Sequence, residues 1–103
     1  MRIIKEVAKR IKEELHDAEW YAREALEHKA LNPEIADVYH HLAMEEMTHA
    51  SLLHDKVVAL AKKASAEREP PAVMRELWAW QHEEIMEEEV EVKRLFDLYA
   101  KHS

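Results

Sequence analysis

Residues 30–34 read Ala30-Leu31-Asn32-Pro33-Glu34, and this short stretch separates two long segments of regular hydrophobic spacing. Asparagine is a favoured N-cap residue, and proline is favoured at the first position of a helix. A second break, Glu69-Pro70-Pro71, must end any helix that precedes it. The two breaks therefore divide the chain into three predicted helices, at about 3–30, 33–66 and 71–101.

The composition favours an all-α fold in one domain over residues 1–103. Of these 103 residues, 48 % are apolar, and none is glycine or cysteine. Good helix formers dominate, whereas hairpin turns and phosphate-binding loops depend on glycine. The lack of cysteine excludes disulfides and iron–sulfur clusters. Because the link at residues 31–32 is short, we expect the first two helices to form an antiparallel hairpin.

The charge balance bears on partners and location. Fifteen basic and 22 acidic residues give a net charge of −7, which disfavours nucleic-acid binding because phosphate neutralisation needs a basic face. No apolar run approaches the length of a membrane span, and the N-terminal residues do not resemble a secretory signal. We therefore expect a soluble, cytoplasmic protein with no nucleic-acid or membrane partner.

Each predicted helix carries a stripe of apolar residues at steps of three and four, and polar residues interrupt all three stripes. The expected inward stripe of the first helix is Ile4, Val7, Ile11, Glu14, Ala18, Tyr21 and Ala25. That of the second is Ile35, Tyr39, Leu42, Glu46, His49, Leu53, Val57 and Leu60. That of the third is Trp78, His82, Ile85, Glu89, Val92, Phe96 and Tyr99. A buried carboxylate is costly unless it is paired or binds a metal.

Glu14, Glu46 and His49 are predicted to form one metal site. If the chain folds back near residue 32, Glu14 lies 18 positions before the turn, and Glu46 and His49 lie 14 and 17 positions after it. Glu46 and His49 form a Glu-x-x-His motif, whose spacing puts both side chains on one helix face. Glu13-x-x-His16 is a second match, but it falls off the stripe. His82 is either a ligand, an interior histidine or a hydrogen-bond donor to a ligand.

Counting ligands predicts a dimer. In di-iron carboxylate bundles two helices each supply a glutamate, and two others each supply a Glu-x-x-His motif. The predicted hairpin offers half of this set, so a two-fold dimer would complete a four-helix bundle around two metal ions. A homodimer or larger homo-oligomer is therefore expected.

The hairpin resembles the encapsulated ferritins, which belong to the ferritin-like superfamily. The resemblance covers roughly residues 10–60. It rests on Glu13-Glu14-Leu15 followed by Trp20-Tyr21, and on Glu45-Glu46-x-x-His49-Ala50. It implies that each chain holds half a ferroxidase centre, that Glu14, Glu46 and His49 bind iron, and that Trp20 packs near the site. It also implies an encapsulin shell as partner, although the ending Tyr99-Ala100-Lys101-His102-Ser103 does not look like a shell-targeting tail.

The expected function is oxidation of Fe(II) for iron handling or storage, at a site with two iron ions per dimer. Manganese and zinc are alternative metals, and peroxidase or catalase activity of the same centre stays open. The alternative function is a non-catalytic helical interaction module, in which Trp78 and Trp80 dock a partner and any metal is structural or adventitious.

Overall fold

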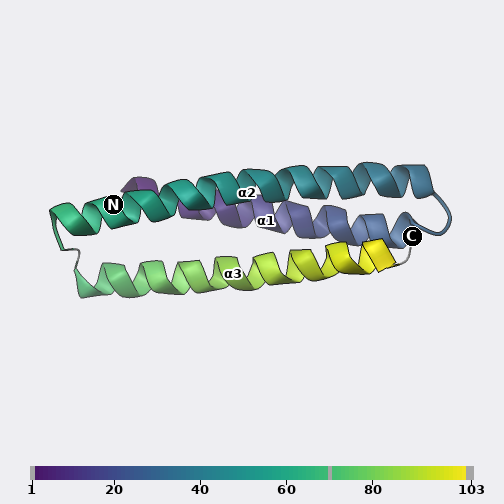
Figure 1. The fold of residues 1–103 in the computed structure, drawn as a ribbon. Coiled ribbons are helices and arrows are strands. Elements are labelled where there is room, and N and C mark those ends of the chain that lie inside the picture. Colours follow the sequence, from purple (N-terminus) through teal and green to yellow (C-terminus); the bar gives the residue numbers. More distant parts are fainter. Residues whose placement is uncertain (1, 70, 102–103) are drawn as a thin grey trace.

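The computed structural model describes residues 2–69 and 71–101, and it forms three long helices (Figure 1). They are α1 (Arg2–His28), α2 (Pro33–Glu67) and α3 (Ala72–Lys101). These bounds confirm the three predicted helices, and every element of the described chain is helical. Pro70, within the second break, and His102 and Ser103, at the end of the C-terminal segment, lie outside the described residues.

The first break acts through the backbone and the proline ring. Asn32 is the N-cap of α2 and Pro33 takes the first helical position, as predicted, but the Asn32 side chain makes no capping hydrogen bond. Instead, the amide of Ala36 donates to the carbonyl of Asn32 at 2.9 Å, and the amide of Asn32 donates to the carbonyl of His28 at 2.8 Å. Proline at this position needs no N–H partner, and its φ angle already suits a helix.

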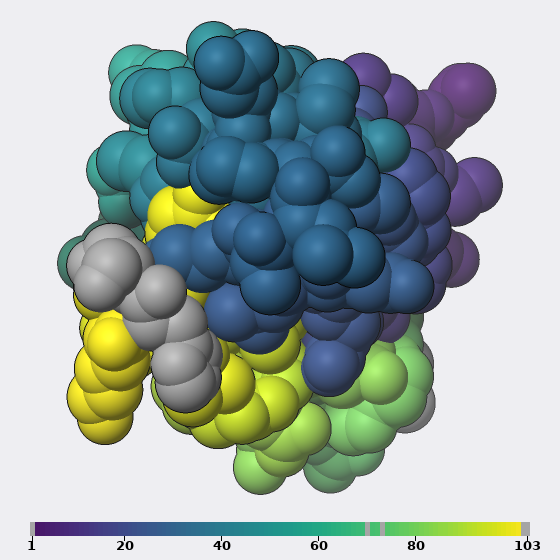
Figure 2. All heavy atoms as spheres, turned by 90° about the vertical axis from the view of Figure 1, so that its right-hand side faces the viewer, coloured from purple at the N-terminus to yellow at the C-terminus, as the bar shows by residue number. Residues whose placement is uncertain are grey.

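The helices form an elongated bundle, about 55 Å along its longest axis. α1 and α2 lie side by side as an antiparallel hairpin, and α3 returns in the direction of α1 (Figure 1). α1 packs against both other helices, whereas α2 and α3 approach each other less closely. The view from the turn at 29–32 shows α3 on one side of the bundle and the α1–α2 hairpin on the other (Figure 2). None of the described helices has a stretch apolar enough to cross a membrane.

The inward stripe predicted for α1 is confirmed. Five of its seven residues are buried, including Glu14, and Val7 and Tyr21 are partly buried against the core. The main core cluster joins residues of all three helices: Ile11, Leu15, Ala18, Met47, Ala50, Ile85 and Val92. Burial of this apolar surface is the main force that holds the bundle together.

The fully buried stripe of α2 lies one position after the predicted one, although the predicted Tyr39, Leu53 and Val57 are partly buried against the core. The buried residues of α2 are Ala36, Ala43, Met47 and Ala50, whereas Ile35 is 51 % exposed. α2 carries two apolar stripes, and the structure buries the one with the smaller side chains. Alanines on α1 and α2 let the two backbones approach closely, which increases close-packed contact along the hairpin.

The larger apolar side chains of α2 lie on a different side of this helix, which we call the outer face. Its members are Ile35, Val38, Leu42, Glu46, His49 and Leu52. At ~100° per residue these positions fall within an arc of roughly 120°. Ile35, Val38 and Leu52 are all more than half exposed. An exposed apolar stripe of this kind is typical of an interaction surface.

α3 is attached by an apolar stripe and by polar contacts at several heights. Ile85, Glu89, Val92 and Tyr99 are buried as predicted, but His82 is exposed. The polar contacts to the hairpin include Lys12–Glu84, Arg23–Glu91 and the hydrogen bond that the Tyr99 hydroxyl donates to Asp37. Together these contacts fix the position of α3 along the axis of the hairpin.

Candidate metal centre

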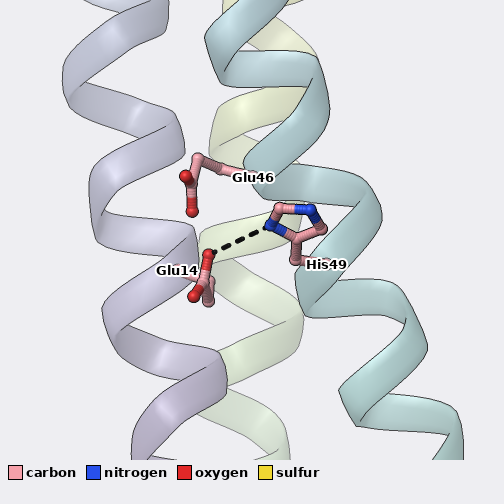
Figure 3. Close-up of side chains that lie close together, drawn as sticks. All are labelled: Glu14, Glu46 and His49. Atoms are coloured by element: carbon pink, nitrogen blue, oxygen red, sulfur yellow. Dashed lines mark ion pairs between the residues drawn. The ribbon is translucent and has the colours of Figure 1, made fainter.

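Three predicted ligands meet at the seam between α1 and α2. Glu14 projects from the middle of α1, and Glu46 and His49 project from successive turns of α2 (Figure 3). One ligand atom from each of the three residues lies within 4.8 Å of the other two. The α3 ribbon passes behind the seam, so the cluster opens on the side of the hairpin away from α3 (Figure 3).

The cluster lies at the edge of the core and not inside it. The side chain of Glu14 is 11 % exposed, whereas that of His49 is 57 % exposed. The exposure of Glu46 lies between those of these two residues. The difference follows from the faces involved, because Glu14 belongs to the buried stripe of α1 while Glu46 and His49 belong to the outer face of α2. The site is therefore reachable from outside the bundle.

Glu14 is only partly satisfied by its neighbours. Its Oε1 pairs with Nη2 of Arg10 at 3.2 Å. Its Oε2 lies 3.7 Å from Nδ1 of His49, which is too long for a hydrogen bond, and this buried atom has no hydrogen-bond partner. Buried polar atoms normally have a partner, so an unpaired carboxylate oxygen beside other ligands indicates room for a cation.

The carboxyl group of Glu46 holds its proton more tightly than an ordinary glutamate does. The pKa of Glu46 is raised to about 7, chiefly by its hydrogen bond with Glu14, and burial and the negative charges of Glu14 and Asp17 raise it further. The charge of His49 acts in the opposite direction. Two close carboxylates cannot both ionise easily, and a bound cation would remove this constraint by taking the place of the proton.

The donor set suits a divalent transition metal. Carboxylate oxygens bind hard cations, and a neutral imidazole nitrogen adds affinity for iron, manganese or zinc. Glu14, Glu46 and His49 supply two carboxylates and one imidazole, which is half of the set found in di-metal carboxylate bundles. The residues present therefore fit such a metal. Three side chains do not complete its coordination sphere, so further positions stay free for other ligands.

An aromatic cluster lies beside the seam, toward the turn. The ring of Trp20 contacts Tyr21 and Tyr39 edge-on, with centroid distances of 5.4 and 5.8 Å. Tyr39 also stacks on Tyr21 and on His28. The cluster stiffens the hairpin on the turn side of the site. Tyr39 therefore serves in packing here.

Two other sequence candidates lie elsewhere. Glu13 and His16 face a groove of about 700 Å³ between α1 and α3, whose lining also includes Asp17, Glu84 and Glu88. This is a different side of α1 from the one that carries Glu14. His82 lies beside His54, with 3.1 Å between their nearest ring nitrogens. The structure therefore brings together Glu14, Glu46 and His49, and it does not bring His82 to them.

Sequence reasoning missed two features of the site. Arg10 stands four residues before Glu14, and this i,i+4 spacing on one helix was the available signal for their ion pair. Four members of the outer face of α2 were predicted to face the core, because the apolar spacing there is as regular as that of the buried stripe. They are Ile35, Leu42, Glu46 and His49. The smaller size of Ala36, Ala43 and Ala50 was the signal that distinguishes the two faces.

No family model, curated protein or solved structure matches this chain. The residues and geometry of the chain itself therefore carry the functional proposal.

Proposed function

We propose that two copies of this chain pair across the outer face of α2, bind two iron ions between them and oxidise Fe(II). The observation that carries the proposal is the convergence of Glu14, Glu46 and His49, whose ligand atoms lie within 4.8 Å of one another. The unpaired Oε2 of Glu14 and the raised pKa of Glu46 support it, because both are features that a cation would relieve.

The number of ligands argues for the second copy. Two chains together would supply four carboxylates and two imidazoles, enough for a pair of metal ions on the two-fold axis. Manganese and zinc suit the same donors, and iron is favoured here because the motifs in residues 10–60 resemble those of the encapsulated ferritins.

The outer face of α2 offers a surface for the second copy. Apolar side chains flank the two ligands of this helix on both sides along its axis, with Val38 55 % exposed before them and Leu52 63 % exposed after them. Covering this stripe would remove apolar surface from water and would enclose the half-exposed ligands. A two-fold axis through the seam between α1 and α2 achieves both.

The side chains have separate roles in the proposed reaction. Bound iron would supply the redox chemistry, because two Fe(II) ions together would give up two electrons. With two protons these electrons would reduce dioxygen to hydrogen peroxide, or hydrogen peroxide to water. The carboxylates of Glu14 and Glu46 offset the positive charge, and Glu46 gives up its proton when metal binds. His49 contributes a nitrogen donor, and burial of Glu14 strengthens its attraction to the cation.

A matched pair of glutamates tests the site. Glu46→Gln removes one ligand charge with little change of shape, and Glu45→Gln makes the same change at an exposed neighbour. We expect Glu46→Gln to lose Fe(II) oxidation and most bound iron. Glu45→Gln should oxidise and bind iron as wild type does, and circular dichroism should show full helicity in both variants. Fe(II) oxidation by Glu46→Gln at the wild-type rate would show that the site is assigned wrongly.

Metal analysis separates the proposal from the interaction-module alternative. Protein purified without an affinity tag should contain close to one iron per chain after Fe(II) loading, and light scattering should give a dimer or larger species. A metal-free monomer with full helicity after loading would contradict the proposal. It would support a module whose exposed Trp80, at present covered in part by Lys12, docks a partner.

A further inference from the structure

A second group of histidine and carboxylate side chains lies between α2 and α3. Nε2 of His54, on α2, is 3.1 Å from Nδ1 of His82, on α3. The ring centroids are 5.0 Å apart and the planes are tilted by 31°. His54 is largely buried, with 16 % of its side chain exposed, whereas His82 is exposed. Solvent therefore reaches the pair through His82, whereas His54 is held between the helices.

A buried carboxylate stands behind this pair. The side chain of Glu89 is 10 % exposed, and its Oε1 lies 3.9 Å from Nδ1 of His54. Among the side chains that the structure describes, His54 is the only basic group within ion-pairing distance of Glu89. This distance is too long for a direct hydrogen bond, so the charge of Glu89 is poorly compensated. Added positive charge at the histidine pair would stabilise it.

The pair lines a pocket of about 290 Å³ with mainly apolar walls, which include Ile4, Val57 and Ala61. Two further polar atoms near its wall, Trp78 Nε1 and Gln81 Oε1, are buried without a hydrogen-bond partner. An apolar pocket with a few convergent polar groups is the usual form of a binding site. It has room for the water molecules that would fill open coordination positions of a small cation.

We propose that His54 Nε2 and His82 Nδ1 bind one divalent transition-metal ion of the imidazole-preferring class, with Zn²⁺ as the representative. Two nitrogens at ~2.0–2.1 Å from a tetrahedral zinc ion lie roughly 3.3 Å apart, close to the observed separation. Glu89 is the positioning residue, since its carboxylate faces Nδ1 of His54 and favours the tautomer that leaves Nε2 free for metal. The iron centre and this site use different residues, so each stands without the other.

The same spacing also suits a hydrogen bond between two neutral rings, so the test must count nitrogens bound to metal. The starting protein is the untagged full chain carrying Glu46→Gln and His49→Gln, which removes the other cluster. Cu²⁺ is the probe, and pulsed electron paramagnetic resonance reports how many imidazoles it binds. We expect two imidazole nitrogens per copper. A signal from one imidazole, or from none, would overturn the proposal.

Zinc titration then assigns the nitrogens to residues. In the same background, His54→Gln and His82→Gln should each lower the Zn²⁺ affinity at least tenfold. His41→Gln changes an exposed histidine of α2 and should leave the affinity within twofold. Equal Zn²⁺ affinity in all four proteins, with helicity intact, would contradict the assignment even if copper binds elsewhere.

A glutamate pair tests the role of Glu89. Glu89→Gln should weaken Zn²⁺ binding about 10–100-fold, the usual effect of losing a carboxylate that orients a ligand histidine. The two-imidazole copper signal should survive, because both ligand nitrogens remain. Glu87→Gln, at an exposed position of the same helix, is the control. Unchanged Zn²⁺ affinity in Glu89→Gln would remove Glu89 from the proposed site.

Discussion

The two apolar faces of α2 have opposite fates, although their spacing in the sequence is equally regular. Ala36, Ala43 and Ala50 are fully buried against α1 and α3, while the larger Val38 and Leu52 remain exposed on the outer face. Small side chains let the helices of one chain pack closely, and the larger ones are left for a partner. The comparison teaches that regular apolar spacing identifies a buried face only when side-chain size is considered as well.

The candidate metal centre lies where the outer face of α2 meets the buried face of α1. Glu46 and His49 follow the outer face, and Glu14 follows the buried face of α1. The site is consequently half-enclosed in one chain, which is what a centre completed by a second copy requires. The His54–His82 pair lies on another side of α2, toward α3, so this one helix carries two candidate sites of different composition.

Enlarging the buried face should have the largest effect. Ala43→Leu forces a bulky side chain between α1 and α2, and overpacking of this kind costs about 1–3 kcal/mol of unfolding free energy. Ala59→Leu makes the same change at an exposed position of α2 and should stay within about 0.5 kcal/mol of wild type. Urea unfolding measures both. Equal stability of the two variants would show that Ala43 is not packed as described.

Charging the outer face should break the pairing of chains but not their fold. Leu52→Glu places a carboxylate in the apolar stripe, and we expect the dimer to dissociate at least tenfold more readily, which is about 1.4 kcal/mol. Ser51→Glu adds the same charge at an exposed position about 100° around the helix from Leu52 and should leave the dimer intact. Sedimentation of both variants is the measurement. A Leu52→Glu protein as dimeric as Ser51→Glu would rule out this face as the interface.

The raised pKa of Glu46 predicts a pH dependence of the stability of the metal-free protein. The pKa of Glu46 rises in the folded state from its ordinary value of 4.5 to about 7. The folded state therefore binds this proton more tightly than the unfolded chain does. The stability that the proton contributes is present below pH 4.5 and is lost as the pH rises through 7.

Comparison with Glu46→Gln isolates this effect, because glutamine resembles the protonated side chain at every pH. With chelator present, the two proteins should melt together at pH 4.5, and wild type should melt lower at pH 8. Since Glu46 is only half-buried, solvent screens the repulsion, and we expect a difference of roughly 2–4 °C. A constant difference between the two melting temperatures across this range would contradict the raised pKa.

The smallest effect is expected at Arg10, which competes with metal for Glu14. Its guanidinium lies 3.2 Å from Glu14 Oε1 but is itself 63 % exposed, so the ion pair is weak. Arg10→Gln should raise metal affinity about two- to threefold. Lys9→Gln removes the same charge from an exposed neighbour and should change the affinity less. Titration with a redox-silent divalent ion compares the two, and a lower affinity in Arg10→Gln would show that Arg10 assists binding.

Much of the fold could be predicted from local signals. Proline and the capping position marked the start of α2, and the absence of glycine together with the three- and four-residue spacing predicted the helices. The convergence of Glu14, Glu46 and His49 followed from their similar distances to the turn, because an antiparallel hairpin aligns residues that are about equally far from it. The buried face of α2 and the neighbour of His82 could not be found in this way.

By itself, the sequence determined the three helices, the direction of the hairpin and the height at which Glu14 meets Glu46 and His49. These depend on local backbone preferences and on counting residues along a rigid rod. Only the tertiary structure decided the rotation of α2 about its axis, and with it the burial of the alanine face and the exposure of the outer face. It also decided that His82 lies beside His54, because the rotation and height of α3 depend on how side chains of all three helices fit together.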